Sequence, residues 1–590
     1  MAQWLSTRLS HDWKGVGVMH REVVTLHTLL AQALVLAMAA LAGGCNANAQ
    51  NARPSTAKPS VVKPGAAKPD SHKPAAVSTR IVAPIATSPV PSPDPALPRA
   101  GINLNGPADW NSELPFVDVF RLSREWISQK KGEAWGKGPQ LKLDERGWVQ
   151  KLEPDTWAET PMNTVKHAPA GRYTVFYKGK GQLDVGGDGR KIEEAAGKMV
   201  FEAQGSGSIF LRLVATDPTD YVRDIRVVMP GFEQSYEKQV FHPIFLQRWR
   251  GMTVLRFMDW MNTNNSKQQK WADRPKVENA TWTRDGGIPL EVMIDLSNRL
   301  GADPWFCMPH LADDDYVRNF ATLVKNRLHP ARRVYIEYSN ELWNGQFEQS
   351  RWAGQKGMEL KLGDKPWEAG WHYTARRSVQ IFKIWDGAFG GREAASKRLV
   401  RVLGSQSANV YVSEQILQFE DAYKSADALA IAPYLSFNVP QQGDGLTAAT
   451  VSTWSVNQVL DHLEQKALPE TVKWIVDNKK VADKYGVKMI AYEAGQHAVG
   501  IQGGENNEAL TQLFHEANRS ARMGELYTKY LNAWKDNGGG LICMFASVGE
   551  WSKWGSWGLM QSYHDKPADY PKFAATLNWA KAQSQPVSLK

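Results

Sequence analysis

The chain has 590 residues, of which 43% are hydrophobic and 22% are charged, and its formal net charge at pH 7 is +9. This length and apolar content allow a large buried core and exclude a chain that is disordered throughout. The positive excess gathers in residues 46–100, which hold seven Lys or Arg and two Asp, so it does not indicate a nucleic-acid partner.

The N-terminal region, residues 1–45, has the features of an export signal. Residues 29–44 (LLAQALVLAMAALAGG) are apolar, too short for a transmembrane helix, and preceded by Arg21. The ending LAGGC resembles a bacterial lipobox, which implies lipidation of Cys45 and attachment to the outer membrane or cell surface. The alternative is ordinary cleavage near residues 47–49, which would give a periplasmic or secreted protein.

Residues 46–99 are rich in Pro, Lys and Ala and contain almost no large apolar side chains. The dipeptide Lys-Pro recurs at 58–59, 63–64, 68–69 and 73–74. Such a composition cannot bury enough surface to fold, and the prolines favour an extended backbone. We therefore expect a disordered linker.

Folded sequence begins at Ala100 with a short apolar strand, and residues 100–137 are expected to hold the first strand of a barrel. Residues 138–230 then contain alternating runs such as RYTVFYKGKGQLDV, broken by glycine clusters. This alternation predicts an inserted antiparallel β domain. Two roles are open for it, as a sugar-binding surface or as a structural wall beside a cleft.

In residues 231–585 apolar runs alternate with helical patterns. With the strand near Ile102 they number eight, which predicts an α/β fold, a (β/α)8 TIM barrel with an inserted β domain. Cys307 and Cys543 lie inside two of the runs, so we expect buried free thiols. The seven runs are MTVLRFMDW, PWFCMPH, VYIEYSNE, LVRVLGSQ, ALAIAPYL, VKMIAYE and LICMFAS.

The fourth and seventh predicted strands each end at a carboxylate. The run at 334–338 stops at Asn340 and Glu341, and the run at 487–492 stops at Glu493. Active sites of such barrels lie at the carboxyl ends of the strands, and a pair of carboxylates there is the arrangement that hydrolyses glycosides.

The sequence E-x-x-N-E, from Glu337 to Glu341, resembles the strand-four motif of the large clan of retaining glycoside hydrolases with an (α/β)8 barrel. The resemblance spans residues 100–137 and 231–585. It implies that Glu341 is the acid/base and Glu493 the nucleophile, with a raised pKa for Glu341 and hydrogen bonds and a cation that keep Glu493 ionised.

Four further side chains are candidates for substrate binding or for positioning the glutamates. Asn340 would donate to the sugar 2-hydroxyl, and Tyr434 would hydrogen-bond Glu493. Arg256 resembles the clan's strand-two arginine beneath the nucleophile, or else pairs with Glu337 in the barrel floor. His310 is either a subsite donor or a structural histidine.

The loop after the eighth strand, SVGEWSKWGSWGL, suggests a platform for sugar rings, because aromatic faces pack against the C–H faces of pyranoses. Trp551, Trp554 and Trp557 are expected to form this platform, with Trp551 at the reacting subsite. Trp343 and Trp260 on other loops are further candidates. By contrast, tryptophans at helical spacing, such as Trp371, are expected in the core.

The leading hypothesis is a retaining hydrolase of a β-linked polysaccharide or oligosaccharide, with endo action favoured. The alternative is a non-catalytic carbohydrate-binding lipoprotein of the cell envelope. No cofactor is expected, and the acidic run at 313–315 is interpreted as a helix start and not as a metal site. We expect a monomer whose partners are a polysaccharide and, through the lipid anchor, a membrane.

Overall fold

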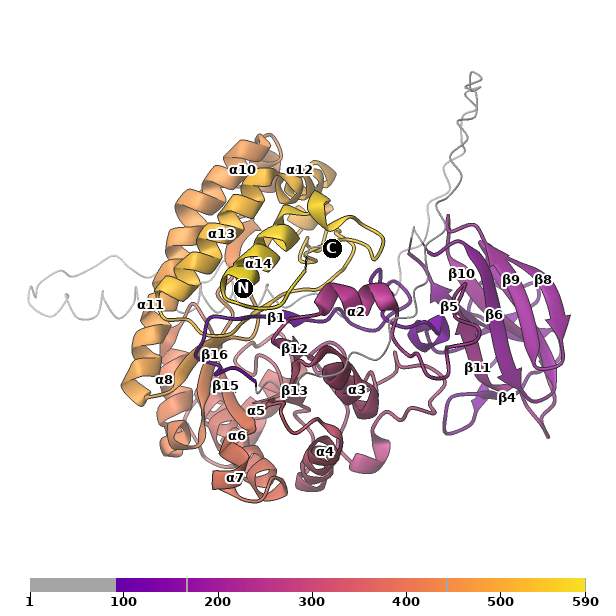
Figure 1. Cartoon of the computed structure of the whole chain (residues 1–590), viewed down its shortest axis with the longest axis horizontal. Coiled ribbons are helices and arrows are strands. Elements are labelled where there is room, and N and C mark those ends of the chain that lie inside the picture. Colours follow the sequence, from indigo (N-terminus) through magenta and orange to yellow (C-terminus); the bar gives the residue numbers. More distant parts are fainter. Residues whose placement is uncertain (1–91, 166–167, 442–443, 589–590) are drawn as a thin grey trace, which may run out of the picture.

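The computed structural model describes residues 92–165, 168–441 and 444–588, and their centre is a closed barrel of eight parallel strands (Figure 1). Strand β1 closes it by pairing with the second and the eighth strand, so that Ile102 lies opposite Leu255 and Met544. The predicted barrel is confirmed, with each predicted run in its expected place. In order the strands are β1 (Ala100–Asn103), β12 (Val254–Arg256), β13 (Asp303–Met308), β14 (Val334–Tyr338), β15 (Leu399–Gly404), β16 (Ala428–Ile431), β18 (Lys488–Ala491) and β20 (Ile542–Met544).

Helices surround the barrel. Asp313 caps α4 by accepting a hydrogen bond from the Tyr316 amide, which explains the acidic run before that helix. The segment 508–536 forms two helices, because Ser520 adopts an extended conformation between them. The principal helices are α2 (Pro243–Trp249), α3 (Leu290–Leu300), α4 (Asp314–Arg327), α5 (Glu348–Glu359), α6 (Pro366–Ala388), α8 (Val410–Gln418), α10 (Val456–His462), α11 (Leu468–Tyr485), α12 (Glu508–Arg519), α13 (Ala521–Asp536) and α14 (Pro571–Ala582). Two short helices are α7 (Arg392–Ser396) and α9 (Ala448–Val451).

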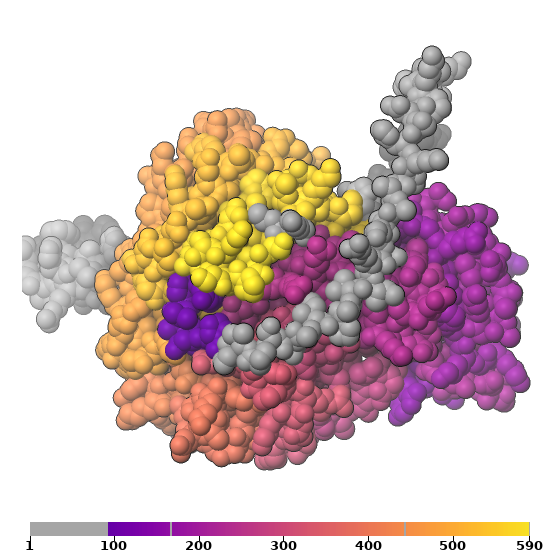
Figure 2. Space-filling model, in the orientation of Figure 1, coloured from indigo at the N-terminus to yellow at the C-terminus, as the bar shows by residue number. Residues whose placement is uncertain are grey.

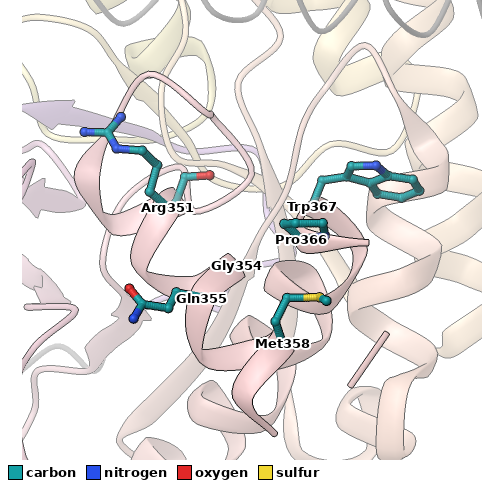
Figure 3. A pocket seen from close by; sticks show the side chains of 7 residues that line it. Arg351, Gly354, Gln355, Met358, Pro366 and Trp367 are labelled. Carbon is teal, nitrogen blue, oxygen red and sulfur yellow. The ribbon is translucent and has the colours of Figure 1, made fainter. Parts of the chain in front are cut away.

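Helices α5 and α6 approach closely because glycines face each other. A Cβ on Gly357 would lie 2.0 Å from the Ala369 carbonyl oxygen, so only glycine fits there. A shallow hollow of about 410 Å³ lies beside this contact, with Met358 on α5 and Trp367 at the start of α6 on its walls (Figure 3). Both side chains are partly exposed, and the hollow shares no residue with the barrel mouth.

The inserted β domain is a sandwich of two four-stranded sheets, whose antiparallel pairing agrees with the prediction. Figure 2 shows it as a lobe against the side of the barrel. Its predicted start at residue 138 is wrong, because β2 at 127–130 already pairs with β5. One sheet has the order β2 (Ile127–Lys130), β5 (Thr156–Asn163), β10 (Ile209–Thr216) and β7 (Gly181–Gly187). The other has β11 (Arg223–Val228), β6 (Gly171–Lys178), β9 (Lys198–Ala203) and β8 (Gly189–Ala195), and a small hairpin joins β3 (Lys142–Leu143) to β4 (Val149–Lys151).

The predicted linker boundary at residue 99 is also wrong, because residues 92–99 pack against the barrel. The Ser92 hydroxyl donates to Asp303, and the Leu541 amide donates to the Pro95 carbonyl at 2.9 Å. The predictions for residues 1–45, including Cys45, and for residues 46–91 lie outside the described residues. Within the described ranges, no helix combines the length and apolar content that a membrane span requires.

Beyond the barrel rim, two strands continue the sixth and seventh barrel strands. They are β17 (Leu435–Val439) and β19 (Gln496–Gly500), which pair in parallel. The breaks between β16 and β17 and between β18 and β19 hold Tyr434 and Glu493. The regular strand conformation is therefore interrupted at the two positions that carry these side chains.

Candidate active site

Glu341 lies just past the end of β14, in a strained turn. Ser339 and Glu341 have φ values of 56° and 44°, in the left-handed region that non-glycine residues rarely adopt. One oxygen, Oε1, accepts a hydrogen bond from the Tyr492 hydroxyl at 3.0 Å, and Oε2 accepts one from the Asn344 amide at 2.9 Å. Both donors are neutral, so this carboxyl group has no hydrogen-bonded cation.

Glu493 lies past the end of β18 and has a cationic partner. Its Oε1 accepts a hydrogen bond from Nη1 of Arg256 at 2.9 Å, and its Oε2 accepts one from the Tyr434 hydroxyl at 2.9 Å. The side chain is buried. These are the two contacts that the sequence analysis expected around this carboxylate.

Arg256, which is fully buried at the end of β12, links the groups of the barrel mouth. Besides Glu493, it donates from Nη2 to Glu337 Oε2 at 2.9 Å and to Asn340 Oδ1 at 2.8 Å. Nη1 also donates to Asn103 Oδ1 at 3.1 Å. The two alternatives for Arg256 therefore hold together, since one guanidinium contacts both glutamates.

The two strand-end glutamates have opposite electrostatic surroundings. Burial and the nearby charge of Glu493 raise the pKa of Glu341 to about 7. Burial also raises the pKa of Glu493, but Arg256 and the Tyr434 hydrogen bond oppose that shift. The Arg256 contact therefore favours the ionised form of Glu493, whereas the described residues offer Glu341 only neutral hydrogen-bond donors.

Asn340 is fixed at both ends of its side chain. Its Oδ1 accepts from Arg256, and its Nδ2 donates to Asn264 Oδ1 at 3.1 Å. Gln349 holds the same arrangement by donating to Asn264 Oδ1 at 2.7 Å and to the Asn340 carbonyl at 2.9 Å. The amide is thus oriented before any ligand arrives, while the expected contact with a sugar hydroxyl stays a prediction.

His310 and Trp343 lie on loops of the same barrel end but contact none of the charged groups described above. His310 is buried against the ring of Trp352, and burial lowers its pKa to about 4, so its imidazole is neutral. Its Nδ1 finds no hydrogen-bond partner among the described residues. Trp343 is half-buried two residues after Glu341. Their proposed subsite roles stay predictions.

The assignment of Trp551 to the reacting subsite is wrong. Its side chain is 5% exposed, its indole N–H donates to the Gly558 carbonyl at 2.9 Å, and its ring lies between Arg519 and Lys572 at 5.0 and 4.7 Å. The loop folds back on itself, and the Trp551 ring is buried inside it. Trp554, in contrast, is 51% exposed.

Trp260 is also buried and not accessible to a sugar. Its indole N–H donates to the Asn105 carbonyl at 3.1 Å, and its ring packs against Phe116 and Phe245. Trp371, which was expected in the core, is buried as predicted, and so is Trp385 on the same helix.

Four residues of the barrel mouth escaped the sequence analysis. Asn103 and Tyr492 each sit at a predicted strand end, so their position was a usable signal. Asp259 lies near the end of the predicted run MTVLRFMDW and had the same signal, whereas Asn344 lies in a loop and gave none. Burial and the charge of Glu493 raise the pKa of Asp259 to about 7, so Asp259 is a third carboxyl group that interacts electrostatically with this site.

Comparison with known proteins gave matches among solved structures alone. No family model matches the chain, and no curated protein matches it. A 4-O-α-L-rhamnosyl-β-D-glucuronidase from Fusarium oxysporum aligns with 13% identity and a TM-score of 0.34, covering 56% of this chain. This chain spans 62% of the length of that enzyme.

Two other solved structures also align with this chain. The endo-1,4-β-D-xylanase 10B of Clostridium thermocellum has 10% identity and a TM-score of 0.31, covering 81% of this chain and 98% of its own. An endo-β-1,4-mannanase from Thermotoga petrophila has 12% identity and a TM-score of 0.29, covering 58% and 74%. The names of all three neighbours are those of glycoside hydrolases, while the closed (β/α)8 barrel of this chain is defined by its own strand pairing.

Proposed function

We propose that the protein is a retaining glycoside hydrolase that cleaves a β-linked polysaccharide or oligosaccharide. The observation that carries the proposal is the pair of glutamates at the carboxyl ends of β14 and β18, of which Glu493 accepts a hydrogen bond from Arg256 while the pKa of Glu341 is raised to about 7. One acid and one carboxylate, held in different protonation states by their neighbours, are what double displacement requires.

In the first step Glu341 gives its proton to the glycosidic oxygen as the Glu493 carboxylate attacks the anomeric carbon. The bond to the leaving sugar breaks, and a covalent glycosyl-enzyme forms. In the second step the Glu341 carboxylate takes a proton from a water molecule, which attacks the same carbon and releases Glu493. Arg256 and Tyr434 favour the ionised form of Glu493 at both ends of this cycle.

Cleavage within a chain is favoured over cleavage at its end. Trp343 and the exposed Trp554 lie on two different loops of the barrel, after β14 and after β20. Two accessible aromatic rings on separate loops suit a substrate longer than one sugar, because each can pack against a different ring.

Azide rescue tests the two roles. Glu341→Ala should lose about 10² to 10⁴-fold activity on natural glycosides, because their poor leaving groups need a proton. It should still react with aryl glycosides of good leaving groups, and azide should then give a glycosyl azide of retained configuration. Glu493→Ala should be inactive on both substrates, and azide should give the inverted product.

A control for the effect of removing a glutamate elsewhere in the chain cannot use Glu337→Gln, because Glu337 accepts a hydrogen bond from Arg256. Glu359→Gln, an exposed change on α5, serves instead and should leave activity intact. Azide products of swapped configuration would reverse the two roles. Full activity of either alanine variant would remove the pair as the reacting carboxyls, and binding of glycans without any hydrolysis would favour a non-catalytic role.

We also propose that the mature protein is attached to a membrane through lipid on Cys45. The support is the apolar run that ends in LAGGC. Wild type should then partition with membranes, and Cys45→Ser should be released or keep its uncleaved leader, as cell fractionation would measure. Unchanged processing and unchanged membrane association in Cys45→Ser would contradict the anchor.

A further inference from the structure

A cavity of about 670 Å³ lies between the β sandwich and the barrel loops, away from the two glutamates. One wall comes from β6 and β11 of the sandwich. The other comes from residues 116–121 and 277–282, which lead from the first barrel strand and from the loop after β12. None of its lining residues contacts Glu341, Glu493 or Arg256 through a hydrogen bond. Figure 1 shows the sandwich beside the barrel.

Aromatic rings line the cavity at two depths. Nearer the surface, Phe176 stacks on Tyr236 with ring centres 5.1 Å apart and planes 10° apart, and both are half-exposed. Deeper, Trp282 meets Phe116 edge-on at 5.0 Å. The indole N–H of Trp282 is buried and has no acceptor among the described residues.

Charged side chains in the wall are fixed before any ligand binds. Asp118 accepts from the amides of Phe120 and Val227, at 3.2 and 2.8 Å. Its other oxygen lies 3.2 Å from Nε of Arg121 and 3.6 Å from Nε of Arg226. The Arg121 guanidinium also lies over the Trp282 ring at 4.6 Å. Planar donors and acceptors held in place beside aromatic faces suit a ligand with many hydroxyls.

The charges of the lining side chains favour a neutral ligand over an anion. The lining contains four basic and four acidic side chains, namely Arg121, Arg146, Lys178 and Arg226 with Asp118, Asp224, Glu237 and Glu278. An anion site would be dominated by unpaired cations, whereas here Lys178 pairs with Asp224 at 3.0 Å. Hydroxyl groups, in contrast, use carboxylates and guanidinium groups equally well.

We propose that this cavity binds a neutral oligosaccharide, as a second glycan site formed jointly by the β sandwich and the barrel. Its volume falls within the range of small-ligand pockets. Sugar rings pack on Phe176 and Tyr236, and their hydroxyls contact the fixed charged groups beneath. The site holds a glycan and performs no chemistry, so it does not depend on the roles of Glu341 and Glu493.

Calorimetric titration of the full chain tests the site. Glu493→Gln is used as the background, so that no ligand is consumed, and the probes are cellohexaose, xylohexaose and mannohexaose. We expect two binding sites per chain for at least one probe. Adding Val277→Trp, an exposed change that fills the cavity, should leave one site, and adding Tyr236→Ala should weaken one site about 10-fold through the lost ring contact.

Trp135→Ala is the matched control, because Trp135 is an exposed aromatic of the same domain that does not line the cavity, and it should keep both sites. Thermal melting shows whether each variant is folded. If Val277→Trp or Tyr236→Ala is not folded, Arg146→Ala, an exposed change in the cavity lining, takes its place and should weaken the same site. Titration curves unaffected by Val277→Trp would overturn the proposal. So would the absence of binding by all three probes, or a cavity that binds trigalacturonate in their place.

Discussion

The difference between Glu341 and Glu493 arises from single neighbouring side chains. Glu493 has Arg256 and a tyrosine hydroxyl, while Glu341 has a tyrosine hydroxyl and an amide. A cation at hydrogen-bond distance favours the ionised form far more than a neutral donor does. Both residues lie at a strand end, so these contacts, and not their position, make the ionised form more favourable for Glu493 than for Glu341.

This difference predicts the pH dependence of activity. Because the pKa of Glu341 is about 7 and the acid must be protonated to act, kcat/KM should fall as pH rises through about 7. The Tyr492 hydroxyl favours the carboxylate form of Glu341, so Tyr492→Phe should raise this pKa and move the alkaline limb to higher pH. Initial rates on a soluble glycan between pH 4 and 10 measure both effects.

Tyr411→Phe provides the control for that experiment, since Tyr411 is exposed on α8 and removes a hydroxyl without touching the barrel mouth. Its profile should match the wild type. An alkaline limb that stays in place in Tyr492→Phe, or moves to lower pH, would contradict the contact between Tyr492 and the acid.

Among the elements, the loop after β20 shows how a tryptophan-rich segment divides between core and surface. The ring of Trp551 packs near Arg519 and Lys572 and its indole N–H donates to the Gly558 carbonyl, whereas Trp554 is exposed. Lys572 itself is buried, and burial lowers its pKa well below the ordinary lysine value. Its ammonium donates to the Ser556 carbonyl at 2.5 Å, so the loop, Trp551 and α14 hold each other in place.

The loop therefore predicts unequal effects of two alanine variants. Trp551→Ala should lower the free energy of unfolding by about 3 to 5 kcal/mol, because it empties a buried site. Trp554→Ala should change it by less than about 0.5 kcal/mol. Urea denaturation followed by circular dichroism measures both, and similar losses in the two variants would contradict the division.

For the whole molecule, the segment before β1 is part of the barrel. Ser92 and the amide of Arg333 both donate to Asp303, whose pKa burial raises to about 6. Lys488 also pairs with Asp94 at 2.6 Å. The segment thus supplies one of the two donors to Oδ1 of this buried acid, whose Oδ2 has no hydrogen-bond partner among the described residues, so loss of the Ser92 contact would leave the carboxyl group still less satisfied.

A matched pair of truncations tests this packing. A protein beginning at Ala100 should unfold at lower urea concentration than one beginning at Ser92, with a loss of about 1 to 3 kcal/mol from the unsatisfied acid. Ser92→Ala in the longer protein should show a part of the same loss. Equal stability of the two truncated proteins would mean that residues 92–99 contribute nothing to the barrel.

Local sequence determined the barrel strands, their order and the two glutamates at the ends of the fourth and seventh strands. Strand length, apolar content and the residue at which a strand stops are properties of a few consecutive residues, so they can be recognised along the chain. The same holds for the acidic start of α4, where Asp313 caps its own helix.

The tertiary structure alone decided which aromatic rings are accessible, where the sandwich begins, and how Arg256 joins Glu337, Asn340 and Glu493. It also created the cavity between the sandwich and the barrel, whose lining residues range along the chain from Phe116 to Trp282. Burial, shared hydrogen bonds and cavities depend on which distant surfaces meet. A pattern of neighbouring residues does not specify these tertiary contacts, because many packing arrangements satisfy the same local periodicity.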